Sequence, residues 1–145
     1  MLSNLSFLIF GLLYGITVIL MFKQNWKKDV SRKIVSFSLA NILLFIITNK
    51  VFSAQYILWL FPQATLFAYI LRKNYKKLTL ILITITVVLT ILIYPIFWEV
   101  FNKGELFWTL VLLTRNFLLI IILSLCYKVL ITNDPSSLFA KKESK

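Results

Sequence analysis

Arg115 is the residue with the clearest capacity for chemistry in this sequence, because it is a cation inside a long apolar run. Its neighbours on a helix would be apolar, and Asn116 follows it directly. A charged side chain in the hydrocarbon of a membrane is unfavourable unless it is paired or hydrated. A guanidinium can bind a phosphate group through two parallel hydrogen bonds. We therefore expect Arg115 and Asn116 either to contact a lipid-linked phosphate or to belong to a structural pair, with Glu99 or with helix carbonyl groups.

A second group of hydrogen-bonding side chains lies in residues 49–62, which read NKVFSAQYILWLFP. Lys50 is a candidate for contact with an anionic group, and Gln55 and Tyr56 are candidates for contact with a sugar or a phosphate. Polar residues at the entrance of a membrane helix are expected to face protein, water or a ligand. The alternatives are an interfacial anchor for Lys50 and packing within an aromatic belt for the other two.

The sequence offers few residues for acid–base or metal chemistry. It has no histidine, the side chain that most often serves as a general base or metal ligand, and one cysteine, Cys126, in an apolar run. Glu99 and Glu105 are the carboxylates expected on the outer side, and solvated loop carboxylates are seldom bases. We recognise no P-loop, metal-ligand cluster or catalytic triad. We therefore predict no metal and no cofactor, and the catalytic residue is left unassigned.

Membrane helices must position these residues. The chain of 145 residues is 60% hydrophobic and 14% charged, and its apolar residues form long uncharged blocks. A block of about 20 apolar residues spans a bilayer as a helix. We predict an all-α, polytopic membrane protein in which residues 1–131 form one helical bundle and residues 132–145 a polar cytoplasmic tail. The five transmembrane spans are expected at about 3–22, 34–51, 55–71, 78–98 and 106–131.

Two of these spans have features that leave a choice or predict a face. The second apolar run is short, so its helix either continues through residues 49–52 or stops early and leaves a recessed loop. In the third span, Gln55, Trp59 and Gln63 lie on one helical face. We expect that face to point to the protein interior. Pro62 should kink the same helix, because proline deprives a carbonyl of its partner.

The distribution of charge predicts the orientation in the membrane. The formal net charge is +11, and thirteen of the sixteen cations lie in residues 23–33, 72–77 and 128–145. Cytoplasmic loops carry an excess of lysine and arginine. We therefore predict an integral protein of the cell membrane with its amino terminus outside and its carboxyl terminus inside. Because the cations cluster between apolar blocks, we predict contact with membrane lipids and no binding of nucleic acid.

Residues 49–62 resemble a motif of the GT-C superfamily of polytopic glycosyltransferases, and are most similar to its mannosyltransferase-like membrane families. In those families the motif enters a late membrane helix from the outer side. Tyr94-Pro95 at the end of a helix and Arg115-Asn116 in the last helix also resemble the carboxyl-terminal layout of the superfamily. The chain departs from the pattern at Ala54, where many relatives have proline.

The resemblance implies an activity and its partners. The chain would correspond to the C-terminal membrane module of an enzyme that transfers a mannosyl or other hexosyl group from a polyprenyl-phosphate sugar. Lys50, Gln55, Tyr56, Arg115 and Asn116 would then bind the lipid phosphate or the sugar. Such enzymes take a catalytic acidic residue from an outer loop of their N-terminal half, and no residue here matches it. We therefore expect a separate N-terminal half or a partner subunit to be needed for catalysis.

Two other functions fit the same sequence. The chain could be a non-enzymatic membrane protein, such as a transporter subunit or an assembly factor, although no internal inverted repeat supports a transporter. It could also be a complete small enzyme that uses Glu99 or Glu105 as its base.

Overall fold

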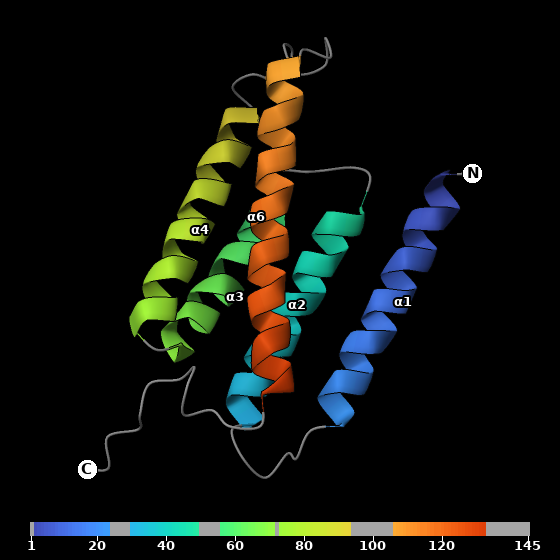
Figure 1. Cartoon of the computed structure of the whole chain (residues 1–145), viewed down its shortest axis with the longest axis vertical. Coiled ribbons are helices and arrows are strands. Elements are labelled where there is room, and N and C mark those ends of the chain that lie inside the picture. Colours follow the sequence, from blue (N-terminus) through green and yellow to red (C-terminus); the bar gives the residue numbers. More distant parts are fainter. Residues whose placement is uncertain (1, 24–29, 50–55, 72, 94–105, 133–145) are drawn as a thin grey trace.

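The protein is all-α in the parts that its computed structural model describes, which are residues 2–23, 30–49, 56–71, 73–93 and 106–132 (Figure 1). The helices in these parts are α1 (Leu2–Phe22), α2 (Val30–Thr48), α3 (Tyr56–Ile70), α4 (Lys73–Ile91) and α6 (Leu106–Ile131). The predicted fold class is therefore confirmed at the level of an all-helical chain.

The helix ends agree with the predicted spans for α1 and α6 but differ for α2 and α4. α2 begins at Val30 and α4 at Lys73, four and five residues before the predicted starts. The basic segments that we expected to be loops are therefore partly the first turns of helices. Lysine and arginine are good helix formers, and their long stems can reach toward the polar boundary. A change from apolar to basic residues therefore does not mark the end of a helix at α2 or α4.

The end of α2 excludes one of the two alternatives for the second apolar run, in which the helix continues through residues 49–52. α2 stops at Thr48, and the backbone N–H of Asn49 still donates to the carbonyl of Phe45 at 3.0 Å. The helix thus ends early, and α2 stops well short of the upper end of α6 (Figure 1). α3 begins at Tyr56 and continues through Pro62.

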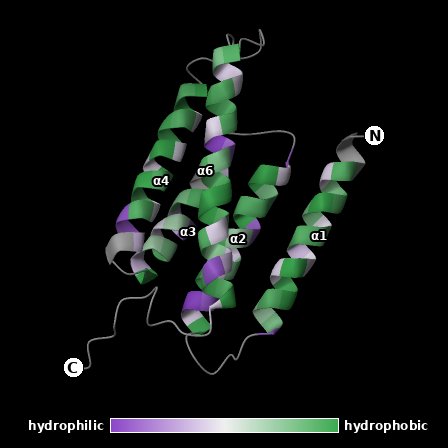
Figure 2. Ribbon diagram, viewed as in Figure 1, coloured by the Kyte–Doolittle hydropathy of each residue, from purple (hydrophilic) through white to green (hydrophobic). Residues whose placement is uncertain are grey.

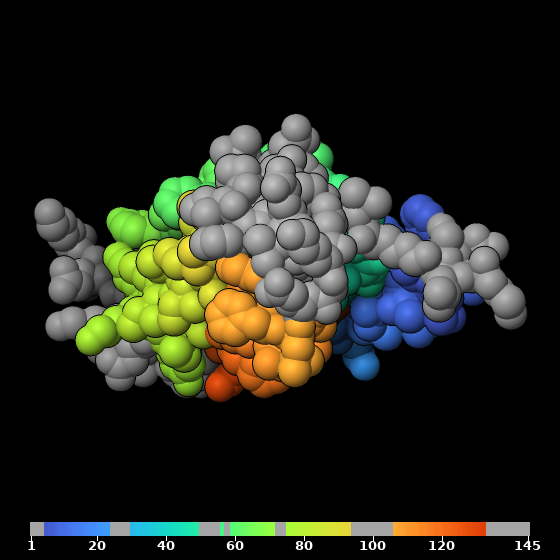
Figure 3. All heavy atoms as spheres, turned by 90° about the horizontal axis from the view of Figure 1, so that it is seen from above, coloured from blue at the N-terminus to red at the C-terminus, as the bar shows by residue number. Residues whose placement is uncertain are grey.

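α2 and α6 form the centre of the bundle. α2 contacts α1, α3 and α6, and α4 contacts α3 and α6, so α3 and α4 lie on one side and α1 on the other. α1 also contacts α6, and Figure 3, viewed from the end at which α6 begins, shows α4 and α1 on opposite sides of α6. The buried core comes from the facing sides of α2, α3, α4 and α6, with residues such as Leu43, Phe67 and Ile122 fully enclosed.

The inward face of α3 differs from our expectation. Leu60, Ala64 and Phe67 are buried, whereas the Trp59 side chain is 56% exposed and Gln63 is half-buried. The expected polar stripe is therefore not the interior face where the structure describes it. The small Ala64 side chain allows close approach to neighbouring helices, so packing, rather than polarity, sets the rotation of α3.

The outer surface of the bundle is apolar along the helices. Large hydrophobic side chains on all of the described helices are exposed, including Phe7, Leu66, Ile85 and Phe117. α1, α2 and α6 are each long and apolar enough to cross a membrane. Figure 2 shows hydrophobic ribbons over most of their length, with hydrophilic segments toward the lower ends of α2, α4 and α6. An apolar exterior of this kind is typical of a protein whose solvent is lipid.

Candidate functional site

Arg115 is buried within the bundle, with 2% of its surface exposed. It lies on the face of α6 that also carries Trp108, Leu119 and Ile122, at spacings of seven, four and seven residues, and these three side chains are buried as well. Residues at such spacings share one side of a helix. The inward rotation of this apolar stripe therefore carries Arg115 into the protein, as the sequence predicted for an arginine in a membrane span.

Asn116 is held against Arg115. The Nη2 group of Arg115 donates a hydrogen bond to the Oδ1 atom of Asn116. A guanidinium has five N–H donors in a rigid fork, and this bond uses one of them and orients the group. The structure thus brings together the two residues of α6 that we predicted as site residues.

Asn49 and Tyr56 are also brought together, from the end of α2 and the start of α3. The Asn49 Nδ2 group donates to the Tyr56 hydroxyl at 3.1 Å. The Tyr56 ring meets the Phe45 ring edge to face at 5.5 Å between centroids and lies 5.6 Å from the Trp59 ring. Asn49 and Phe45 are four residues apart, so both reach Tyr56 from the same side of α2. Tyr56 therefore connects the start of α3 to the end of α2 through both its hydroxyl group and its ring.

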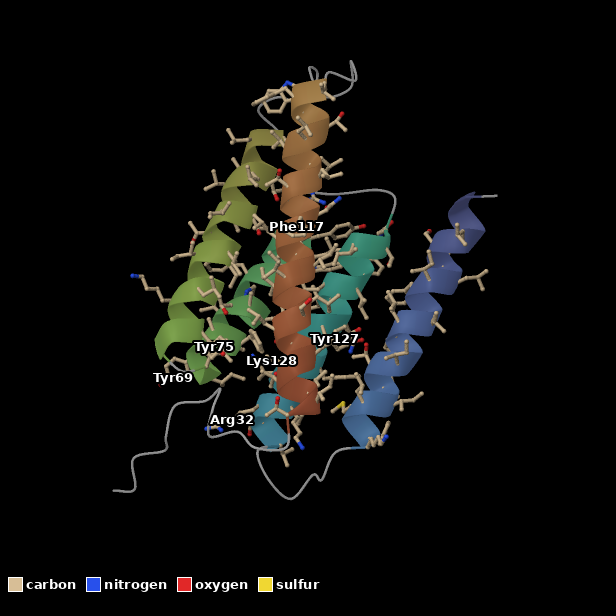
Figure 4. The ribbon with its side chains drawn as sticks, in the orientation of Figure 1. Arg32, Tyr69, Tyr75, Phe117, Tyr127 and Lys128 are labelled. Atoms are coloured by element: carbon tan, nitrogen blue, oxygen red, sulfur yellow. The ribbon has the colours of Figure 1, made fainter. Side chains whose placement is uncertain are left out.

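The two pairs lie at comparable heights in the bundle. Figure 4 shows Phe117 on α6 close to the level at which α2 ends. Arg115 precedes Phe117 by two residues, which is about 3 Å along a helix axis. The Arg115–Asn116 pair on α6 and the Asn49–Tyr56 pair between α2 and α3 therefore both lie near the level at which α2 ends, nine residues along α6 from its start at Leu106.

Several predicted residues lie outside the residues that the structure describes. These are Lys50, Gln55, Ala54, Tyr94, Pro95, Glu99 and Glu105. All five carboxylates of the sequence belong to the undescribed segments: Asp29, Glu99, Glu105, Asp134 and Glu143. Within the described ranges, no group of three or more histidine, cysteine, aspartate or glutamate side chains could hold a metal ion.

The structure reveals polar contacts that the sequence did not predict. The Thr17 hydroxyl of α1 lies 2.8 Å from the Tyr127 hydroxyl of α6. Lys33, which we placed in a loop, is buried in the first turn of α2 with 8% exposure. Such contacts depend on how each helix is rotated, and the apolar residues around these positions give no periodic signal that would fix the rotation.

Two cation–π contacts were also missed. The Lys76 ammonium lies 5.1 Å from the centre of the Tyr69 ring, and the Lys128 ammonium lies 5.4 Å from the Tyr75 ring. Each contact joins two helices, α3 with α4 and α4 with α6. The only sequence signal is the presence of tyrosines beside basic residues at the predicted cytoplasmic side, and this signal does not identify pairs.

Two buried hydroxyl groups on α4, those of Thr86 and Thr90, are satisfied locally, whereas the buried Thr79 hydroxyl has no hydrogen-bond partner within the described residues. The Thr86 hydroxyl donates to the Leu82 carbonyl at 2.8 Å, and the Thr90 hydroxyl donates to the Thr86 carbonyl at 2.7 Å. Such bonds to the preceding turn are common for threonine in helices. These two residues therefore need no ligand to account for their burial.

Comparison with known proteins adds no relative to this picture, because no family model, curated protein or solved structure matches the chain.

Proposed function

We propose that the chain is a multi-pass membrane protein with five spans, its amino terminus outside and its carboxyl terminus inside. Three helices long and apolar enough to cross a membrane support insertion. The excess of lysine and arginine in residues 23–33, 72–77 and 128–145 supports the orientation. In this arrangement the Arg115 and Tyr56 end of the bundle faces outward.

We further propose that this outward end binds the phosphate of a polyprenyl-phosphate sugar, as part of a glycosyltransferase that transfers a hexosyl group. The observation that carries the proposal is the buried Arg115 guanidinium, oriented by Asn116 within an otherwise apolar helix. Ionisable groups inside a membrane helix mark ligand or ion sites by default. A guanidinium also has the fork geometry that phosphate recognition requires.

Tyr56 and its partner Asn49 would define the side of the site nearer to the sugar or headgroup. Their hydrogen bond and the contact with Phe45 hold the start of α3 in place. Lys50 directly follows Asn49 and Gln55 directly precedes Tyr56 in the sequence. We therefore propose Lys50 and Gln55 as further contacts to the ligand. The acidic residue needed for sugar transfer would come from a partner chain or from Glu99 or Glu105.

Binding of a polyprenyl phosphate to the purified full-length chain in detergent micelles tests the phosphate role. We expect Arg115→Ala to weaken binding by about tenfold to a hundredfold, because it removes a charge-assisted, two-bond contact. The affinity of Arg115→Lys should lie between those of the unchanged protein and Arg115→Ala, since lysine keeps the charge but lacks the planar guanidinium geometry. Thr114→Ala is the matched control, because Thr114 is an exposed neighbour that bonds the Leu110 carbonyl at 2.9 Å.

Equal binding by Arg115→Ala and Thr114→Ala, with unchanged helix content and elution volume, would exclude the phosphate role. Sugar transfer is then measured with the chain alone and with a partner N-terminal half. Transfer that disappears in Glu99→Gln or Glu105→Gln would show that the chain supplies its own base.

A second candidate function is a non-enzymatic subunit of a membrane assembly. The observation that favours it is the mainly apolar interior of the described bundle, in which most buried polar side chains are threonines. Under this candidate no sugar transfer occurs with any partner, whether or not the lipid phosphate binds at Arg115. Stable copurification with a transport protein would support it.

A further inference from the structure

We propose that the end of the bundle opposite to Arg115 carries a binding surface for the phosphate headgroup of an anionic phospholipid. We call this surface the basic end, and it consists of Arg32 on α2, Lys76 and Lys77 on α4, and Lys128 on α6. The inference requires insertion in a membrane but does not depend on the proposed transferase activity.

The cations of the basic end come from three helices, of which α2 and α4 each pack against α6. α2 and α4 begin at this end and α6 finishes there, so cations from separate parts of the sequence lie at the same end of the bundle. Figure 4 shows Arg32, Tyr69, Tyr75 and Lys128 at this end of the ribbon. Positive charges in the first turns of α2 and α4 are opposed by the helix dipole, which favours anions there. An anion at this end would be stabilised both by the lysines and by the helix starts.

Aromatic rings hold two of these cations in place. The Lys76 ammonium lies over the Tyr69 ring at 5.1 Å, and the Lys128 ammonium lies over the Tyr75 ring at 5.4 Å. A cation over a ring keeps its N–H donors available on the side away from the ring. The rings therefore restrict the lysine side chains in advance, which lowers the entropy lost when they contact a phosphate.

The burial of Lys33 shows that the start of α2, which carries part of the basic end, is packed against other helices. Its side chain is buried, and the adjacent Ser36, also buried, donates from its hydroxyl to the Arg32 carbonyl at 2.8 Å. The α2 start is thus packed among the other helices. Charge concentrated against packed helix ends favours a localised headgroup over a loose layer of counterions.

The surroundings of the basic end favour a lipid over a soluble anion. Directly beside the cations, the α4 surface exposes Leu78, Leu80 and Ile81, and Tyr69 of α3 is exposed as well. These apolar side chains would contact acyl chains while the cations contact the headgroup. Across the whole sequence, thirteen cations are predicted on this side against the carboxylates Asp29, Asp134 and Glu143. The surplus of positive charge remains large, so an anionic headgroup is preferred to a zwitterionic one.

The test compares phosphatidylglycerol with phosphatidylcholine for binding to the full-length chain, by native mass spectrometry from detergent micelles. We expect a preference for phosphatidylglycerol that falls at least tenfold in the triple variant Arg32→Gln, Lys76→Gln, Lys128→Gln, since each surface cation contributes on the order of fivefold. The matched control removes the same charge from the tail, through Lys141→Gln, Lys142→Gln and Lys145→Gln, and should keep the preference.

A second pair of variants keeps the test decisive if the triple variant misfolds. Tyr75→Leu removes the ring beneath Lys128 and should reduce the preference, whereas Tyr75→Phe keeps the ring and should preserve it. Equal losses in the triple variant and the tail variant would overturn the proposal in favour of diffuse charge. Displacement of the lipid by millimolar inorganic phosphate would overturn it in favour of a soluble anion.

Discussion

At the scale of single residues, one pair of hydroxyl groups ties α1 to the rest of the bundle. The Thr17 hydroxyl donates to the Leu13 carbonyl at 2.7 Å and lies 2.8 Å from the Tyr127 hydroxyl. Because Thr17 has only one hydroxyl proton, Tyr127 must be the donor to Thr17. The proton order is therefore Tyr127 to Thr17 to Leu13, a chain that crosses from α6 to α1.

Breaking this chain should loosen α1. We expect Thr17→Val to lower the free energy of unfolding by about 1 kcal/mol and Tyr127→Phe by about 0.5 kcal/mol, because only the first leaves a donor without its acceptor. The double variant should cost less than the sum of the two, by about 0.5 kcal/mol. Reversible unfolding in mixed micelles measures these values. Strictly additive losses would show that the two hydroxyls do not interact.

Residue chemistry predicted part of the candidate site. The burial of Arg115 followed from its type and its apolar helix, because an arginine in lipid must face protein or water. The contact between Asn49 and Tyr56 could not be predicted, since it depends on where α2 ends and how α3 re-enters. The same holds for Thr17 and Tyr127, which are 110 residues apart in the sequence. The type of a residue determines whether it needs a polar partner, and helix packing determines which partner it contacts.

At the scale of elements, the two faces of α3 predict different sensitivities to mutation. Phe67 is fully buried between neighbouring helices, and Phe61 on the same helix is 53% exposed. We expect Phe67→Ala to lower the free energy of unfolding by about 3 kcal/mol, because it leaves a cavity in the core. Phe61→Ala should cost under about 1 kcal/mol, because lipid refills the space. Unfolding in mixed micelles distinguishes the faces, and equal losses would mean that α3 is rotated differently.

The elements themselves were largely predictable, but their ends and rotations were not. Long uncharged runs predicted a helix in each described segment, and α6 matches its expected range of 106–131. The expectation that the basic segments 23–33 and 72–77 are loops throughout was wrong, because α2 and α4 begin within them and basic residues continue a helix past the apolar run. The prediction of which face of α3 points inward was wrong, because nearly all residues of this helix are apolar. In such a helix, small side chains such as Ala64 decide the contact face, and hydropathy carries little information about it.

At the scale of the whole molecule, the two ends of the bundle differ in chemistry. The Arg115–Asn116 and Asn49–Tyr56 pairs lie near the level at which α2 ends, and the opposite end of α2 carries Arg32, beside Lys76 and Lys128 with their tyrosines at the same end of the bundle. A bilayer is itself asymmetric, with anionic lipid enriched on the cytoplasmic side. This asymmetry of the protein supports the orientation that we propose, in which the basic end is inside.

The number of spans depends on α3 and α4. α3 has 15 residues, which extend about 22 Å, less than the hydrocarbon thickness of about 30 Å. α1, α2 and α6 alone could span with α3 and α4 as a re-entrant hairpin entered from outside. Both arrangements place the amino terminus outside and the carboxyl terminus inside, so labelling of the termini alone does not separate them. The turn between α3 and α4 does separate them.

Accessibility of single cysteines in intact cells therefore tests the topology, after the buried Cys126 is replaced by alanine. We expect a membrane-impermeant maleimide to label Ser3→Cys from outside and to label Ser137→Cys only after permeabilisation. Asn74→Cys, at the start of α4, should also require permeabilisation if the chain has five spans. Labelling of Asn74→Cys in intact cells, or protection from both treatments, would establish the hairpin. The lysines around residue 74 would then lie away from the cytoplasm, against the charge rule that orients the remaining helices.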